Sequence, residues 1–162
     1  ELYYGNKLQL FLYSLAIERE MNKKVVGGFY LPLHNKFTRE IKNNYCLNGY
    51  FVNEDFVIRA LDKNVQASER SDIVDMRLTK DFKARSMPDG REMENLKNYS
   101  KRVSENAVDE IKSGYIKPSP LDSSNTCEYC PYSQTCLKKC KNLSMRRANS
   151  VKLSSFEEVQ NA

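Results

Sequence analysis

Apolar side chains recur at helical spacing in two long segments of the chain. The first covers residues 6–22, with Asn6 as its expected N-cap. Its apolar face is predicted to carry Leu8, Phe11, Leu12, Leu15 and Ala16. The second covers residues 91–113 and ends at Gly114. Its apolar positions are Leu96, Tyr99, Val103, Ala107 and Ile111. Each pattern predicts a helix that buries one face.

The segments between these helices favour strands and short elements. Residues 25–33 surround Gly27-Gly28 with β-branched and aromatic side chains, and residues 43–52 repeat that character, so both are predicted to be strands joined by residues 35–42. Residues 54–62 are typical of a short helix, and residues 73–78 with 82–84 of a small hairpin. Asp89-Gly90 is a turn signal. The fold class is therefore expected to be α/β.

The composition changes after Tyr115, where Pro, Ser and Asp become frequent and a cysteine-rich stretch follows. We therefore expect three parts: residues 1–114 as the folded domain, residues 115–147 as the cysteine-rich segment, and residues 148–162 as a polar tail that is poorly ordered unless it packs back on the domain.

Cys127, Cys130 and Cys136 form a C-x2-C-x5-C pattern, and Cys140 follows four residues later. Thiolates this close together are costly unless a cation neutralises them, so the spacing favours a soft metal ion or an iron–sulfur cluster. Disulfides or unrelated buried thiols are the alternatives, and a small zinc-binding interaction module would need all four cysteines as ligands. Cys46 stands among apolar strand residues and is expected to be a core thiol.

Charge and composition narrow the class of protein only slightly. The 162 residues are 40% hydrophobic and 29% charged, with a net charge of +5. This balance suits an acidic partner such as nucleic acid but is also common on ordinary surfaces. Phosphate contacts are the functional interpretation of the basic residues near the cysteines, and solvated charge is the alternative. These residues are Lys138, Lys139, Arg146 and Arg147.

The sequence contains neither an apolar run long enough to span a membrane nor a signal peptide. The odd number of cysteines favours a reducing compartment. A cytoplasmic location with no membrane partner is therefore expected. The chain begins Glu-Leu-Tyr-Tyr-Gly without Met, and we interpret it as a piece of a longer polypeptide.

Gln9 and Tyr13 form a Q-x3-Y pattern on the first predicted helix, where they are i, i+4 neighbours. On its own the pattern also fits a solvated Gln and a Tyr at the margin of the core. The stretch from Tyr4 to Tyr13, however, resembles the segment after the catalytic strand of RecB-family nucleases of the PD-(D/E)XK superfamily. Together with the cysteine pattern, it resembles the C-terminal nuclease domain of the B subunits of AddAB (RexAB) helicase–nucleases.

This resemblance implies a restriction-endonuclease-like nuclease core, only part of which lies in this chain. It implies that Gln9 and Tyr13 support metal-dependent cleavage of single-stranded DNA. It also implies that the enzyme is an ATP-dependent helicase–nuclease that processes broken duplex ends, with a helicase–nuclease A subunit as partner. The Mg²⁺-binding Asp and the D-x-K element of such nucleases precede the Q-x3-Y helix and are absent here. Three E/D-x-K triplets elsewhere are interpreted as chance: Glu40 with Lys42, Asp81 with Lys83, and Glu110 with Lys112.

The resemblance also implies a 4Fe–4S cluster held by Cys127, Cys130 and Cys136 together with one cysteine upstream of this chain. Cys140 is then a thiol outside the cluster or a loose substitute ligand. The predicted role of the cluster is structural. A third possibility for the protein is another iron–sulfur exonuclease of the same superfamily.

Overall fold

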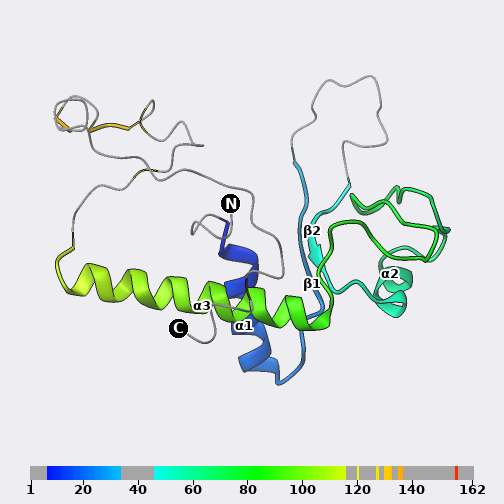
Figure 1. The fold of residues 1–162 in the computed structure, drawn as a ribbon, viewed down its shortest axis with the longest axis horizontal. Helices are drawn as coiled ribbons and strands as arrows, with labels where there is room; N and C mark the ends of the chain where they lie inside the picture. The colour runs from blue at the N-terminus through cyan, green and yellow to red at the C-terminus, as the bar shows by residue number, and fades with distance from the viewer. Residues whose placement is uncertain are drawn as a thin grey trace.

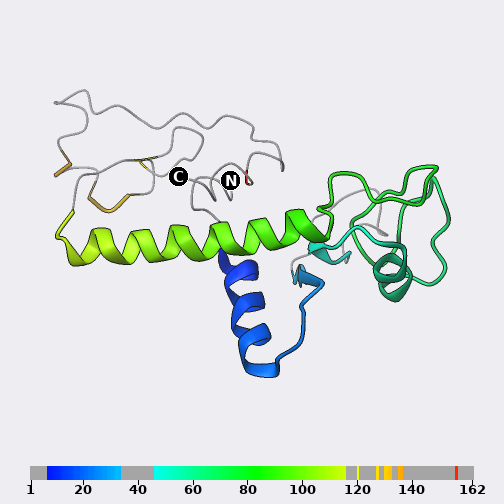
Figure 2. The same cartoon turned by 60° about the horizontal axis from the view of Figure 1, so that its bottom comes forward.

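The computed structural model describes residues 7–33, 46–115, 120, 127, 130–132, 135–136 and 156. In these residues it contains α1 (Gln9–Met21), β1 (Gly27–Tyr30), β2 (Asn48–Phe51), α2 (Asp55–Leu61) and α3 (Gly90–Lys112). Figures 1 and 2 show α3 as a long rod, with the two strands and α2 at its N-terminal end and α1 crossing it at a steep angle. The expected small α/β architecture is confirmed for this part of the chain.

Helix α1 starts slightly later than the sequence predicts and buries a narrower face. Leu8 occupies the N-cap position and makes no side-chain cap hydrogen bond, so the prediction that Asn6 caps the helix is wrong. Phe11 is the one fully buried residue of α1, whereas Ala16, expected on the inner face, is exposed. The difference arises because α1 crosses α3 instead of lying along it, and a crossing helix buries only a short strip.

Strands β1 and β2 pair in antiparallel fashion, with Gly27 opposite Phe51 and Tyr30 opposite Asn48. Both are shorter than the predicted segments. Val25 lies outside β1, and its N–H donates to Glu18 Oε1 at 2.7 Å. The predicted link over residues 35–42 lies outside the described residues.

Residues 52–89 form a compact unit around α2, which confirms the short helix predicted over residues 54–62. The hairpin prediction is only partly right, because Leu78 pairs with Ala84 through an isolated bridge and no two-strand ladder forms there. A buried hydrogen bond of 2.6 Å from Ser71 Oγ to Asp62 Oδ2 ties the loop to the end of α2. This hydrogen bond lowers the pKa of Asp62 against the opposing effect of burial.

Helix α3 matches the predicted segment, but only its first half is buried. The buried positions are Met93, Asn95, Leu96, Lys97 and Ser100. Tyr99 and Val103 are half-buried as expected, whereas Ala107 is exposed and Ile111 is 75% exposed. The apolar periodicity therefore predicted the helix correctly and overestimated how much of it is covered.

Helix α3 begins with a capping box, whereas the sequence analysis indicated only a turn at Asp89-Gly90. Asp89 Oδ1 accepts from the N–H of Glu92 at 2.8 Å, and Glu92 Oε2 accepts from the N–H of Asp89 at 3.0 Å. The two side chains satisfy two backbone donors that a helix start otherwise leaves open.

Asp89→Ala is expected to lower the free energy of unfolding by about 1 kcal/mol, because one of these donors loses its acceptor. Urea unfolding followed by circular dichroism would measure the loss. Asp81→Ala, an exposed Asp outside any helix, is a suitable control. Equal stabilities of the two variants would contradict the role of the cap.

The C-terminal part of the chain contributes a core residue. Phe156 is only 5% exposed and packs edge-on against Tyr99 of α3, with the ring centroids 4.9 Å apart. Phe156 is the one residue of the segment 148–162 that the structure describes. At this position the chain packs back on the domain. In the described residues no helix has both the length and the apolar character needed to cross a membrane.

Candidate functional site

The outer face of α1 carries the predicted Q-x3-Y pair. Gln9 Nε2 donates a 3.0 Å hydrogen bond to the Tyr13 hydroxyl, and both residues are exposed. Residues two apart on a helix lie about 200° apart around its axis, so this pair points away from the side on which Phe11 is buried. The structure thus confirms that Gln9 and Tyr13 project together. Their catalytic role stays a prediction.

Beyond this pair, the same strip of α1 is apolar. Ile17 and Met21 follow Tyr13 at intervals of four residues, and the three side chains are 58%, 45% and 60% exposed in chain order. Residues four apart share one side of a helix. The outer face therefore consists of a polar hydrogen-bonded pair followed by an uncovered apolar strip.

The inner face of α1 meets a buried lysine of α3. Lys97 is 1% exposed, and its Nζ lies 2.6 Å from Glu18 Oε1 and 2.9 Å from Glu94 Oε1. It also donates to the carbonyl oxygen of Val25 at 3.5 Å. Lys24 Nζ approaches Glu94 Oε1 to 3.3 Å from the outside. These contacts join α1, α3 and the segment that leads into β1.

The electrostatics of this cluster keep Lys97 and Glu94 charged. Burial alone would lower the pKa of Lys97, but the hydrogen bonds from its ammonium group to Glu18 and Glu94 outweigh burial and raise the pKa. For Glu94, burial acts to raise the pKa, and the hydrogen bonds and positive charges of Lys97 and Lys24 lower it overall. Lys97 is therefore ionised at neutral pH and is held by two carboxylates.

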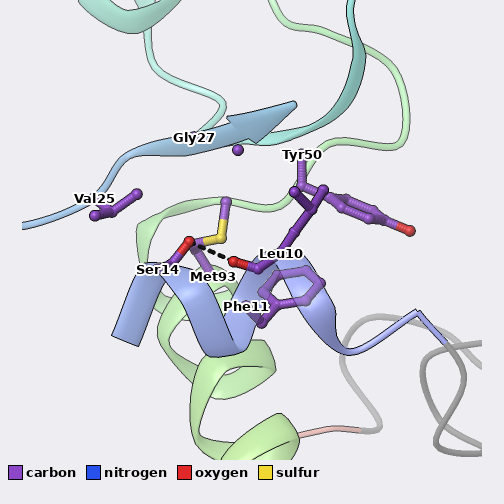
Figure 3. A pocket seen from close by; sticks show the side chains of 8 residues that line it. Leu10, Phe11, Ser14, Val25, Gly27, Tyr50 and Met93 are labelled. Atoms are coloured by element: carbon purple, nitrogen blue, oxygen red, sulfur yellow. Dashed lines mark hydrogen bonds between the residues drawn. The ribbon is translucent and has the colours of Figure 1, made fainter. Parts of the chain in front are cut away.

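Between α1, β1 and α3 lies a small pocket (Figure 3). Its lining includes Leu10, Phe11, Ser14, Val25, Gly27, Gly28, Tyr50 and Met93. Its volume is about 10 Å³, which is room for one water at most. Ser14 Oγ, at the edge of this space, already donates to the carbonyl oxygen of Leu10 at 2.8 Å. The pocket is a packing joint and is too small for a substrate.

The cysteines that the sequence singles out are thiols in the structure. Cys127, Cys130 and Cys136 are partly buried and are not in disulfides. Their chemistry fits a thiolate-bound metal or cluster, but they are not gathered around one point: among the described residues, no group of three Cys, His, Asp or Glu side chains could hold a metal ion. The cluster thus stays a prediction.

The remaining residues singled out from the sequence give a mixed result. Cys46 is buried as expected, and its Sγ donates to the carbonyl oxygen of Asp72 at 3.4 Å. Desolvation raises the pKa of this thiol. Outside the described residues lie Cys140 and the basic residues Lys138, Lys139, Arg146 and Arg147.

The E/D-x-K triplets do not resemble catalytic centres where the structure describes them. Lys83 lies 2.9 Å from Asp55 Oδ1 on an exposed surface. Glu110 and Lys112 are exposed in the last turns of α3. Glu40 and Lys42 lie outside the described residues. The interpretation of Asp81-Lys83 and Glu110-Lys112 as chance spacings fits their positions.

The Lys97 cluster was not predicted from the sequence. Glu94-x2-Lys97 is a spacing that commonly makes an exposed pair on a helix. The one available signal was that Lys97 stands within the apolar sequence positions of α3, directly after Leu96 and four residues after Met93. The partner across the interface, Glu18, comes from a helix whose crossing point with α3 no local pattern predicts.

Comparison with known proteins places the chain in a family. The model of the PD-(D/E)XK nuclease superfamily matches residues 1–137. Curated relatives named as the B subunit of an ATP-dependent helicase/deoxyribonuclease include one from Clostridium kluyveri, 28% identical over 84% of this chain, and one from Clostridioides difficile, 26% identical over 84% of it. Another, from Thermoanaerobacter sp., is 24% identical over 99% of it. The chain spans 14% to 16% of the length of these relatives. Because the family model covers most of its residues, the chain belongs to the PD-(D/E)XK nuclease superfamily.

Proposed function

We propose that this chain is part of the nuclease domain of the B subunit of a cytoplasmic, ATP-dependent helicase–nuclease. The observation that carries the proposal is the match of residues 1–137 to the nuclease superfamily, together with relatives that are named as B subunits of a helicase/deoxyribonuclease. The substrate is DNA, namely single strands and broken duplex ends, and the reaction is metal-dependent exonucleolytic cleavage during recombinational repair. The partner is the A subunit of the same enzyme.

The exposed Gln9–Tyr13 pair supports cleavage by presenting oriented hydrogen-bonding groups. Because Gln9 Nε2 donates to the Tyr13 hydroxyl, the carbonyl oxygen of Gln9 remains an acceptor and the Tyr13 hydroxyl proton remains available for donation. These two groups can orient catalytic side chains or the DNA backbone. Their mutual hydrogen bond restricts both side chains before the substrate arrives, which is how positioning groups lower an activation barrier.

The metal-binding part of the reaction lies with residues outside this chain. In the intact nuclease an Asp and a D-x-K element hold Mg²⁺, which supplies activation of the attacking water. Because the chain contains no such element before Gln9, the chain alone is inactive under this proposal.

The cysteine segment has a structural role in the same proposal. Cys127, Cys130 and Cys136 supply three thiolates to a 4Fe–4S cluster, and a cysteine upstream of this chain supplies the fourth. Cys140 is dispensable or substitutes loosely. A cluster of this kind connects distant parts of the chain and couples metal binding to folding.

The proposed role of the pair is tested by Gln9→Ala in the full-length helicase–nuclease. Cleavage of single-stranded DNA is expected to fall about 10- to 100-fold, because one positioning group is lost near the reacting phosphate. The melting temperature should hardly change, since Gln9 is exposed and exposed substitutions usually cost under about 0.5 kcal/mol.

Glu20→Ala is the matched control, because Glu20 is an exposed polar residue of the same helix. Tyr13→Phe removes only the hydroxyl group and should reproduce part of the Gln9→Ala defect. Unchanged cleavage by Gln9→Ala, measured with folded enzyme, would refute the proposed role.

A further inference from the structure

We propose that Lys97 is a positioning residue that fixes the rotation of α1 and so directs Gln9 and Tyr13 toward the site of cleavage. This inference rests on the proposed function of that pair. It follows from the hydrogen bonds of the Lys97 ammonium group and from the burial of one side chain of α1, that of Phe11.

Few buried side chains hold α1. Phe11 is its one fully buried residue, at 3% exposure, and its ring lies 5.2 Å from the ring of Tyr50. The other apolar residues of α1 that face the domain, such as Leu10, are only half-buried, and dispersion contacts have little directionality, so apolar packing fixes the rotation of the helix only weakly. A second contact on the same face is needed to fix the rotation.

Glu18 supplies that second contact. It lies seven residues after Phe11, two helical turns along the same face. Glu18 Oε1 accepts from Lys97 Nζ at 2.6 Å and from the N–H of Val25 at 2.7 Å. The C-terminal half of α1 is thereby tied both to α3 and to the chain entering β1.

The ammonium group of Lys97 has three donors, and the structure provides three acceptors. These are Glu18 Oε1, Glu94 Oε1 and the carbonyl oxygen of Val25. A lysine whose donors are all used inside the protein has none left for DNA or a reacting group. Lys97 therefore acts on the reaction through α1 and is not a catalytic residue.

A small rotation of α1 would be enough to disturb the pair. Side chains on a helix extend about 5–6 Å from its axis, so a rotation of about 10–20° displaces them by about 1–2 Å. A displacement of about 1 Å can reduce an enzymatic rate about 100-fold. Gln9 and Tyr13 lie on the face opposite Phe11, where any such rotation is transmitted directly.

The test uses Lys97→Met in the full-length helicase–nuclease, since Met keeps most of the length of the side chain without the charge. We expect kcat for cleavage of single-stranded DNA to fall at least tenfold, while the Kd for DNA changes less than twofold. Lys101→Met is the matched control, because Lys101 lies one turn further along α3, is 62% exposed and approaches Glu105 only to 3.9 Å. It should leave both quantities unchanged.

A double-mutant cycle separates positioning from general damage. In the Gln9→Ala/Tyr13→Phe background, Lys97→Met should reduce kcat less than threefold further, because both groups that it orients are already absent. Fully additive losses in folded protein overturn the inference and leave the role of Gln9 intact. Unchanged cleavage in Gln9→Ala alone overturns the proposed function of the pair and the inference with it.

Glu18→Gln gives the same test in a milder form if Lys97→Met does not fold. It keeps the size of the side chain and an acceptor oxygen for Val25 and removes only the charge that holds Lys97. The expected result is a smaller loss of kcat that again disappears in the Gln9→Ala/Tyr13→Phe background. A loss of the same size in both backgrounds counts against positioning.

Discussion

Gly49→Ala is expected to abolish the native fold. A Cβ at this position would overlap the carbonyl oxygen of Gly28 and lie 2.8 Å from the Cα of Phe29. Both neighbours are backbone atoms of the paired strand, so relief requires β1 and β2 to separate. The described sheet has only these two strands, and a loss of more than about 4 kcal/mol is expected, which is a large share of the stability of a typical domain.

Gly28→Ala is the matched control on the opposite strand. Its added Cβ would meet nothing nearer than Leu10, at 3.7 Å, which is an ordinary contact. Thermal unfolding followed by circular dichroism should show a cooperative transition for Gly28→Ala and none for Gly49→Ala. A normal transition for Gly49→Ala would show that β2 does not approach β1 as closely as described.

Phe156→Ala is expected to lower the free energy of unfolding by about 3–5 kcal/mol. The ring is nearly fully buried and belongs to the same core as Leu96 and Met93. Its removal leaves a cavity beside Tyr99 and also removes an edge-to-face aromatic pair, which contributes about 0.5–1.5 kcal/mol beyond the buried area.

Phe56→Ala serves as the comparison, because the Phe56 side chain is 63% exposed in α2. It should change the free energy of unfolding by under about 0.5 kcal/mol. Urea titrations of both variants would measure the difference. Equal, small losses would mean that Phe156 does not pack on α3.

The helices were the most predictable part of the fold. Residues 91–113 were predicted and α3 covers Gly90–Lys112, because a long amphipathic repeat is a strong local signal. How much of α3 is buried was not predictable, since burial of a residue such as Ile111 depends on the arrangement of distant segments. Asp89-Gly90 was interpreted as a turn because Asp and Gly favour both turns and helix starts, and Glu92 was the overlooked part of the capping box.

Part of the candidate site could also be predicted from local sequence patterns, and part could not. The i, i+4 spacing of Gln9 and Tyr13 predicted their contact, which the structure confirms. The Lys97 cluster depends on the crossing of two helices and could not be derived from either helix alone. Phe156 was missed because a single aromatic residue in a polar tail has no periodicity to reveal it. The iron–sulfur assignment of Cys127, Cys130 and Cys136 stays a prediction.

The contact between Phe156 and Tyr99 also affects how far the length of the cysteine-rich segment can change. Helix α3 ends at Lys112, and Phe156 packs against Tyr99 in the middle of the same helix, so the segment that carries the cysteines is anchored at both ends. The entropy of closing a loop grows only slowly with its length, by about 0.6 kcal/mol for each doubling. Insertions and deletions around the cysteines should therefore be tolerated more readily than changes at either anchor. The contact between Phe156 and Tyr99 already restricts the segment that carries the cysteines. A ligand that binds within this segment therefore has less chain entropy to overcome than a ligand bound by an open tail.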